Sequence, residues 1–457
     1  MVRACSRRKS GYENQVITKL IKLAVPMIVG QLAFASMGFV DTVLLGRLGV
    51  EVLAGGALGT MVFQFFHIVG IGVLTATANL IAFEFGQSRA EGIHTALLSG
   101  VCSVLVLSLV FGLIIANAEP ILLMLGQDRE ILTITSSYLD VVVWALLPAF
   151  SFILLRSLAL GLGDSSAVLP VSIIAAVSNY PISYALMTGS FGLPEMGVRG
   201  VAAGTLIVSI MMAIAMALFI YQKEAFKPFK FWRDWKHFKV SSVVETYRLG
   251  VQIAIAHAME VGMFSAAALL VGAMGAEALA AHQIVLQCIT LSFMLPLGLS
   301  QAVSVKVGKH FGAGNAPETL LIIKYGLIIA SMTATCAGLV FWLLPDVLVS
   351  FFVDENLAAD QFQSLFATAS LLLLVGAMFQ LVDGWQVVLM GVLRGFKLGA
   401  SPTIVATISY WGLGFPAAYF LGQTFGAVGV WSGMGLGLGL SALLLGILVV
   451  KTYRKSF

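Results

Sequence analysis

The chain has 457 residues, of which 59% are hydrophobic and only 11% are charged. Soluble domains carry about 25% charged residues, so this chain has too few polar side chains to cover a soluble globule. The composition excludes soluble enzymes, nucleic-acid-binding proteins and disordered scaffolds, and it predicts a polytopic membrane protein. The net charge of +4 matters only through where the basic residues lie.

Apolar runs long enough to cross a bilayer recur along the whole chain, since about 20 residues span the hydrocarbon core as a helix. Twelve such runs lie at 18–44, 53–82, 93–116, 131–157, 167–188, 198–221, 246–271, 279–305, 319–343, 364–392, 403–421 and 427–450. None shows the alternation of polar and apolar residues that membrane barrel strands show, so each run is predicted to be a transmembrane helix.

The basic residues predict the orientation of these spans. With twelve spans, both termini and every even-numbered connection lie on one side of the membrane. That side holds all of the 26 Lys and Arg residues except Arg47, Arg129 and Arg199. Because cytoplasmic connections are enriched in Lys and Arg, both termini are predicted to be cytoplasmic.

The chain repeats itself at a separation of about 226 residues. Three pairs of segments match in the same order: Gly46–Ala54 with Gly272–Ala280, Phe85-Gly86 with Phe311-Gly312, and Gly197–Gly204 with Gly426–Gly433. The predicted organisation is an N-terminal six-helix lobe (1–221), a basic cytoplasmic linker (222–245) and a C-terminal six-helix lobe (246–457). Since six is even, the lobes have the same orientation and are related by a pseudo-twofold axis along the membrane normal.

Three of the 22 acidic residues lie well inside predicted spans: Asp41 in the first, Glu260 in the seventh and Asp383 in the tenth. A carboxylate at the bilayer centre costs about 2.5–3.5 kcal/mol on insertion scales, so such residues mark functional sites. No Lys or Arg is predicted at a comparable depth to neutralise them. The alternative for each is a buried carboxyl kept neutral by hydrogen bonds. Asp140 lies near the end of its span and is not assigned a function.

Polar side chains follow helical spacing in three spans. Two acids have polar neighbours about one turn away: His257 for Glu260, and Gln380 and Gln386 for Asp383. A similar stripe runs along the eighth span and comprises Gln283, Gln287 and Thr290. Hydrogen bonding between packed helices is the alternative role for these polar residues.

No motif for enzymatic chemistry is present in the sequence. No segment matches G-x-x-x-x-G-K-[ST], so ATP hydrolysis is not expected. The four cysteines form no C-x-x-C pair, the histidines lack metal-ligand spacing, and nothing resembles a catalytic triad. We therefore expect a non-enzymatic secondary transporter that is driven by an ion gradient and has no cofactor.

These motifs resemble those of the multidrug and toxic compound extrusion family, within it the NorM-like bacterial branch, over essentially the whole chain. The resemblance is carried by Pro26 and Gln31 before Phe39-Val40-Asp41-Thr42 and Gly46, by Met259-Glu260-Val261, by Ala281-His282-Gln283-Ile284, by Val382-Asp383-Gly384 and by Leu393-Arg394-Gly395.

The resemblance implies roles for the intramembrane acids. Asp41 falls on the position of the acid in the N-terminal lobe, and Glu260 and Asp383 fall on the acids of the C-terminal lobe. Asn179 resembles a polar position near the N-lobe acid. One branch of the family has a further acid one turn after that position. Here it is Ser183, which argues against a proton mechanism confined to the N-terminal lobe.

The resemblance also implies an activity: a bacterial inner-membrane antiporter that exports cationic or amphipathic drugs in exchange for Na⁺ or H⁺ and so contributes to antibiotic resistance. The physical argument agrees, because an ion that neutralises a buried acid competes with a cationic drug held by the same charge. Glu260, Asp383 and Asp41 are the expected coupling residues, and Glu260 and Asp383 would bind Na⁺ in a sodium-coupled mechanism. The partners are organic cations and the lipid bilayer, with no nucleic acid, and the default state is a monomer.

Aromatic and methionine side chains suit flat, varied organic cations through cation–π contacts and flexible packing. The candidate substrate-binding residues are Asp41, Asn179, Met263, Phe264, Gln283, Gln287, Phe293 and Met294. Core packing is the alternative for the apolar members of this set.

Two other functions of membrane proteins fit the sequence less well. A flippase for lipid-linked precursors would need a basic central cavity to hold pyrophosphate, whereas the deep charges here are acidic. A membrane sensor would not need carboxylates in both repeats, and no appended signalling domain is visible in the sequence.

Overall fold

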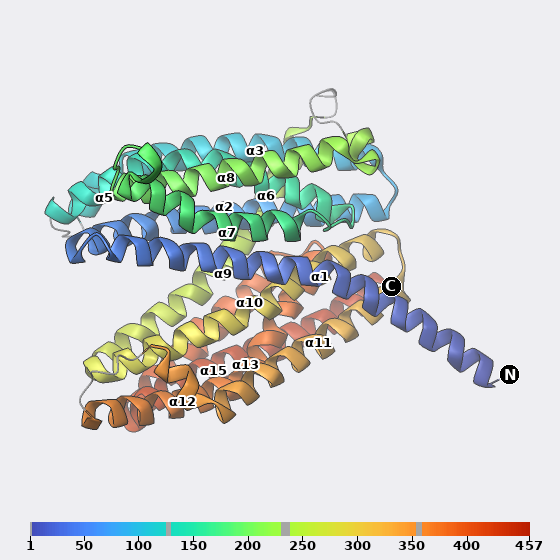
Figure 1. Cartoon of the computed structure of the whole chain (residues 1–457). Helices are drawn as coiled ribbons and strands as arrows, with labels where there is room; N and C mark the ends of the chain where they lie inside the picture. Colours follow the sequence, from blue (N-terminus) through green and yellow to red (C-terminus); the bar gives the residue numbers. More distant parts are fainter. Residues whose placement is uncertain (1, 125–128, 230–237, 353–358) are drawn as a thin grey trace. The chain divides into compact units, whose positions relative to one another are not determined.

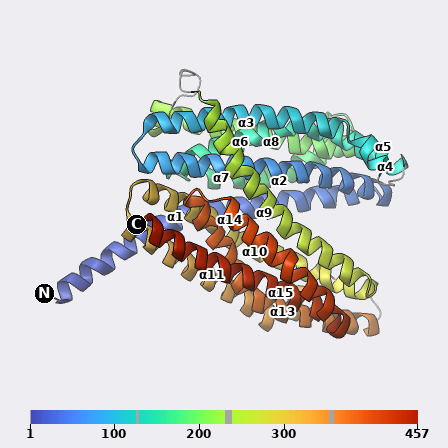
Figure 2. The same cartoon turned by 180° about the vertical axis from the view of Figure 1, so that it is seen from behind.

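The structure, a computed structural model, describes residues 2–124, 129–229, 238–352 and 359–457 (Figures 1 and 2). Within these ranges every regular element is a helix, which confirms the predicted all-α membrane fold. Residues 230–237 of the predicted linker lie outside the described residues.

Most of the helices are long, as the apolar runs predict. In chain order they are α1 (Val2–Gly46), α2 (Val50–Gly86), α3 (Ala90–Ala116), α4 (Ala118–Met124), α5 (Arg129–Val142), η1 (Val143–Ala145), α6 (Leu146–Gly161), α7 (Val168–Thr188), η2 (Ser190–Gly192), α8 (Val198–Gln222), η3 (Glu224–Phe229), α9 (Val240–Gly272), α10 (Ala276–Gly312), α11 (Ala316–Leu343), α12 (Pro345–Ser350), α13 (Ala359–Gly395), α14 (Ala400–Thr407), the π-helix η5 (Ile408–Gly414) and α15 (Phe415–Ser456).

The last two predicted spans lie in one continuous helical segment. Among the described residues, eleven helical segments are long and apolar enough to cross a membrane, and the last is Ala400–Ser456. Its backbone leaves the helical region at Gly426, where φ is +59°. Beyond that point the chain folds back, because Gly433 packs against Ala418 and Gly437 against Gly414. This segment therefore supplies two antiparallel arms, and twelve spans are accounted for.

Contacts divide the chain into two compact units. The N-terminal unit comprises residues 25–254, and the C-terminal unit comprises residues 1–24 together with residues 255–457. Within the N-terminal unit, α2, α3, α6 and α8 run side by side in both views (Figures 1 and 2). Two helices, α1 and α9, each contribute their first part to one unit and the remainder to the other.

The sequence repeat is visible in how each unit packs internally. In the N-terminal unit Gly100 of α3 packs against Thr77 of α2 and Leu154 of α6; in the C-terminal unit Gly326 of α11 packs against Val303 of α10 and Val388 of α13. The same correspondence places Gly49 before α2 and Gly275 before α10, with φ of +120° and +128°. Glycine is needed at both turns because other residues rarely adopt such backbone angles. The repeat is therefore structural and not a chance likeness of apolar segments.

Candidate functional site

In the N-terminal unit, Asp41 is buried and fully engaged by hydrogen bonds. It lies near the end of α1 and is 5% exposed. Thr205 of α8 donates from Oγ1 to Asp41 Oδ2 over 2.8 Å, and Asn179 of α7 donates from Nδ2 to Oδ1 over 3.4 Å. Both donors are neutral, and hydrogen bonds to a carboxylate favour its charged form. These two hydrogen bonds therefore offset part of the cost of burying the Asp41 carboxylate.

Further polar groups surround Asp41. Tyr138 of α5 is fully buried and close enough to Asp41 for an electrostatic interaction. Asn179 Oδ1 and the hydroxyl of Ser183, one turn later on α7, are buried and have no hydrogen-bond partner in the described part of the chain. The surroundings of this acid therefore combine one negative charge with uncommitted polar atoms.

In the C-terminal unit, Glu260 of α9 is connected to α13 and η5 through one glutamine. Gln386 of α13 donates from Nε2 to Glu260 Oε1 over 3.2 Å, and the Tyr410 hydroxyl of η5 donates to Gln386 Oε1 over 2.7 Å. Glu260 is 8% exposed, and Gln386 and Tyr410 are almost wholly buried. His257 Nδ1 lies 3.9 Å from Glu260 Oε2, beyond hydrogen-bond distance.

Asp383 and Arg394 complete the charged groups around this network. Asp383 lies one turn before Gln386, is 2% exposed, and is close enough to Glu260 for their charges to interact. Its Oδ1 atom has no hydrogen-bond partner within the described ranges. Arg394, which was assigned from sequence to the connection after the tenth span, is in fact buried in the last turn of α13. The acidic pair therefore has a buried cation near it.

The other candidate substrate-binding residues are distributed over α9 and α10. Met263 is completely buried and packs near Gly414, whereas Phe264 is half-buried. Gln283 and Gln287 of α10 are exposed, and Phe293 and Met294 are half-buried. None of the hydrogen bonds around Glu260 described above involves them. Gln380, one turn before Asp383, donates instead to the Ser292 hydroxyl of α10.

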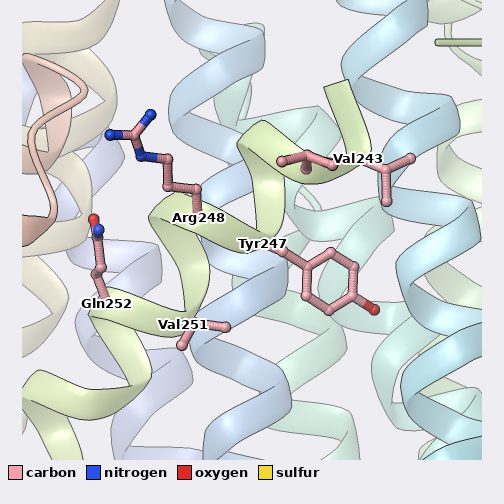
Figure 3. Close-up of a pocket in the computed structure, with 6 residues that line it drawn as sticks. Val243, Tyr247, Arg248, Val251 and Gln252 are labelled. Carbon is pink, nitrogen blue, oxygen red and sulfur yellow. The ribbon is translucent and has the colours of Figure 1, made fainter. Parts of the chain in front are cut away.

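A pocket of about 520 Å³ lies along the first turns of α9. Its lining residues are Val243, Val244, Tyr247, Arg248, Val251 and Gln252 (Figure 3). Tyr247 and Arg248 point to different sides of the helix in this view. The pocket contains none of the acids described above.

The oxygen atoms around the acidic pair are suited to a hard monovalent cation. Carboxylate, amide and phenolic oxygens from Glu260, Asp383, Gln386 and Tyr410 belong to three elements of one unit. No group of three or more His, Cys, Asp or Glu side chains converges in the part of the chain that the structure describes. The donor set therefore suits a proton or a sodium ion and not a transition metal.

Sequence reasoning missed three residues of these sites. Thr205 and Ser209, four residues apart, form a polar pair inside an apolar span. Arg394 lies eleven residues after Asp383, about three helical turns, which places both residues on the same face of a helix. Both signals were available in the sequence. Tyr410 had none, because it lies in the π-helix η5 and its contact with Gln386 joins two different elements.

Comparison with known proteins gives a consistent result for both halves of the chain. The MatE family model matches residues 26–185 and 253–420. A probable multidrug resistance protein NorM of Pseudomonas putida is 36% identical over 428 residues, covering 93% of this chain and 92% of that protein. A protein of the same name from Agrobacterium fabrum is 36% identical over 444 residues, covering 95% of this chain and 94% of that protein.

Solved structures share the fold. The Vibrio cholerae MATE transporter VcmN in its bent form has a TM-score of 0.86 at 16% identity, covering 97% of this chain and 98% of that chain. A MOP superfamily transporter from Pyrococcus furiosus, described as having a binding pocket of reversed polarity, has a TM-score of 0.83 at 17% identity, covering 96% of each chain. At such identities the likeness shows the fold alone.

Proposed function

Because this chain belongs to the MatE family, we propose that it is a secondary active antiporter that exports cationic or amphipathic organic compounds in exchange for Na⁺ or H⁺. The observation that carries the proposal is the pair of buried acids, Glu260 and Asp383, whose charges interact and whose oxygen atoms are only partly engaged by hydrogen bonds. Buried like charges repel each other, so the pair favours the uptake of a cation.

Exchange follows from competition for negative charge. A proton or Na⁺ ion that binds the acids removes the charge that attracts an organic cation, and an organic cation disfavours ion binding for the same reason. Competition between the two ligands does not by itself make them move in opposite directions across the membrane. The ion-loaded and drug-loaded forms must also differ in their preference for the outward-open and inward-open states, since a ligand shifts an equilibrium only by its differential affinity.

The location and partners are part of the same proposal. The relatives of this chain in Pseudomonas and Agrobacterium are bacterial proteins. This supports a location in a bacterial inner membrane. The basic residues support cytoplasmic termini. The partners are small organic cations and lipid, and the chain acts as a monomer with lobes at 1–221 and 246–457 joined by the linker 222–245.

A lipid-precursor flippase is the alternative function on this fold, since one fold hosts several activities. A flippase for pyrophosphate-linked lipids needs cationic groups at the binding site. In this chain Asp41, Glu260 and Asp383 are acidic, and the cation that acts on Glu260 among the described residues is Arg394. The polarity of the sites therefore favours an exporter of cations.

The test is ethidium efflux from cells that lack other pumps, measured with a Na⁺ gradient alone and with a H⁺ gradient alone. Wild type is expected to export under at least one gradient, and Glu260→Gln and Asp383→Asn are expected to lose that export at equal expression. Asp140→Asn is the matched control, because Asp140 is an exposed acid at which the same chemical change is made. Neutral variants that export as well as wild type would show that the acids are structural.

A further inference from the structure

Arg394 lies on the same face of α13 as the groups of the acidic site. Asp383, Gln386 and Arg394 occupy positions i, i+3 and i+11, which follow one side of an α-helix. Gln386 and Arg394 are separated by roughly 12 Å along the helix axis at 1.5 Å per residue. Helical side chains lean toward the N-terminus of their helix, so the long Arg394 side chain shortens this separation.

The arginine is buried without a direct ionic partner. Arg394 is 5% exposed, and its Nη2 atom has no hydrogen-bond partner in the described part of the chain. No acidic oxygen among the described residues lies within 4 Å of it. Its charge nevertheless acts on Glu260 and Tyr410, and it also acts on His257. Arg394 therefore acts on Glu260 by its charge and not through a direct ion pair.

The helices packed around α13 also carry charged and titratable groups. From α9, His257 and Glu260 face the network, and Tyr410 does so from η5. Two lysines of α10, Lys306 and Lys309, interact with Lys19 of α1 and with Glu318 of α11. Among the described residues, Arg394 is the cation whose charge acts on Glu260.

We propose that Arg394 is a built-in counter-charge that sets the cation affinity of the Glu260–Asp383 site. Two carboxylates and one guanidinium leave one net negative charge, which a single monovalent cation neutralises. A net charge inside a membrane protein is costly, so the site is most stable with one proton or one Na⁺ bound. Because Arg394 repels the bound ion, it keeps the affinity of the acidic site for that ion low enough for release in each transport cycle. This inference rests on the proposed function and assigns a specificity-determining role to a residue outside the acid pair.

The test is direct binding of ions to the purified full-length chain, without drug and without transport. Na⁺ binding is measured by ²²Na⁺ equilibrium at a fixed alkaline pH, and proton binding by pH titration without Na⁺, with Glu260→Gln defining the signal of the site. Arg394→Gln is expected to bind the coupling ion roughly tenfold more tightly. The reason is that the repulsion between two unit charges about 10 Å apart, at an effective dielectric constant near 20, corresponds to about a tenfold change in affinity. Arg394→Lys keeps the charge and is expected to bind as wild type does.

Arg156→Gln is the matched control for the loss of a buried arginine. Arg156 of α6 is 4% exposed, lies over the Phe152 ring at 5.9 Å and acts on His67, and it belongs to the other unit. Its substitution is expected to leave ion affinity unchanged. A folded Arg394→Gln variant with wild-type affinity would overturn this inference alone. Wild type that binds neither Na⁺ nor H⁺ at Glu260 would overturn both this inference and the proposed function.

Discussion

The two units carry their intramembrane acids in different ways, although they share one repeat. In the N-terminal unit a single acid, Asp41, accepts hydrogen bonds from Thr205 and Asn179 on its two oxygens. In the C-terminal unit two acids interact, and Asp383 keeps a buried oxygen without a hydrogen-bond partner in the described part of the chain. The first arrangement gives each oxygen of one carboxylate a neutral donor, and the second leaves an oxygen atom available for an exchangeable ion.

This difference indicates a division of labour between the units. A carboxylate that is already satisfied by neutral donors is suited to anchor an organic cation by charge alone. A carboxylate pair with unfilled acceptor positions is suited to coordinate a metal cation or to take up a proton. We therefore propose that Asp41 contributes most to anchoring the organic cation, while Glu260 and Asp383 carry the charge for which the ion and the organic cation compete.

The largest expected effect separates drug affinity from ion affinity. Asp41→Asn removes one partner of a buried charge pair, which costs about 3–5 kcal/mol and corresponds to a loss of roughly a hundredfold or more in affinity for an organic cation. Ion binding at Glu260 is expected to remain at its wild-type value. Ethidium binding and Na⁺ or H⁺ binding to the purified chain would measure the two affinities separately. A parallel loss of ion binding would place Asp41 in the coupling site and end the division of labour.

The next effect concerns the hydrogen bond from Thr205 to Asp41. Thr205→Val removes a hydrogen bond to a charged group while keeping the shape, a change worth about 1.5–3 kcal/mol. Ethidium affinity is expected to fall by roughly tenfold or more. Ser209→Ala is the control, because the Ser209 hydroxyl donates to the Thr205 carbonyl of its own helix and not to Asp41. Equal affinities for the two variants would mean that Asp41 does not depend on its α8 donor.

These sites also show how far the sequence could lead. The acids Asp41, Glu260 and Asp383 could be found because a charge inside an apolar run stands out by composition alone. Thr205 could not be paired with Asp41 from sequence, since their contact joins α1 to α8 across 164 residues. Arg394 was assigned to the wrong environment because basic residues usually mark the ends of spans, whereas α13 extends to Gly395 and buries this one.

The helical hairpins near the end of each unit provide a comparison of stability. A Cβ at Gly433 would lie 2.1 Å from the backbone nitrogen of Ala418. A Cβ at Gly204 would lie 2.0 Å from the Ser183 hydroxyl, which can rotate, and 2.8 Å from the Ser183 Cα, a less severe backbone contact. Overpacking costs about 1–3 kcal/mol, so Gly433→Ala is expected at the upper end and Gly204→Ala at the lower end. Gly439→Ala is the control, since nothing lies within 4 Å of its Cβ position. In thermal unfolding of the purified variants, the loss of melting temperature should be largest for Gly433→Ala, smaller for Gly204→Ala and smallest for Gly439→Ala. A larger loss for Gly204→Ala than for Gly433→Ala would contradict this order.

The smallest expected effect lies at the turn after α6. Partial burial raises the pKa of the Asp164 carboxyl, but hydrogen bonds from Lys223 and Ser166 outweigh it and hold that pKa below its usual value. A carboxyl whose pKa is lowered by folding stabilises the folded state above its unfolded pKa of about 3.9. This contribution is lost as the pH falls through the folded pKa. Leu398 occupies the corresponding turn after α13, where its amide bonds Leu393 as the Asp164 amide bonds Ala159.

Asp164→Asn should therefore lower the melting temperature at pH 7 only slightly, by the equivalent of about 1 kcal/mol or less, because Lys223 is partly exposed and solvent weakens the pair. The difference from wild type should disappear when the pH is taken below the folded pKa, and it should shrink in high salt, since ions screen exposed charges. Leu398→Asn in the other unit removes no ion pair, so its effect should not depend on pH in the same way. An Asp164→Asn deficit that persists unchanged in acid would mean that the turn depends on the shape of this side chain and not on its charge.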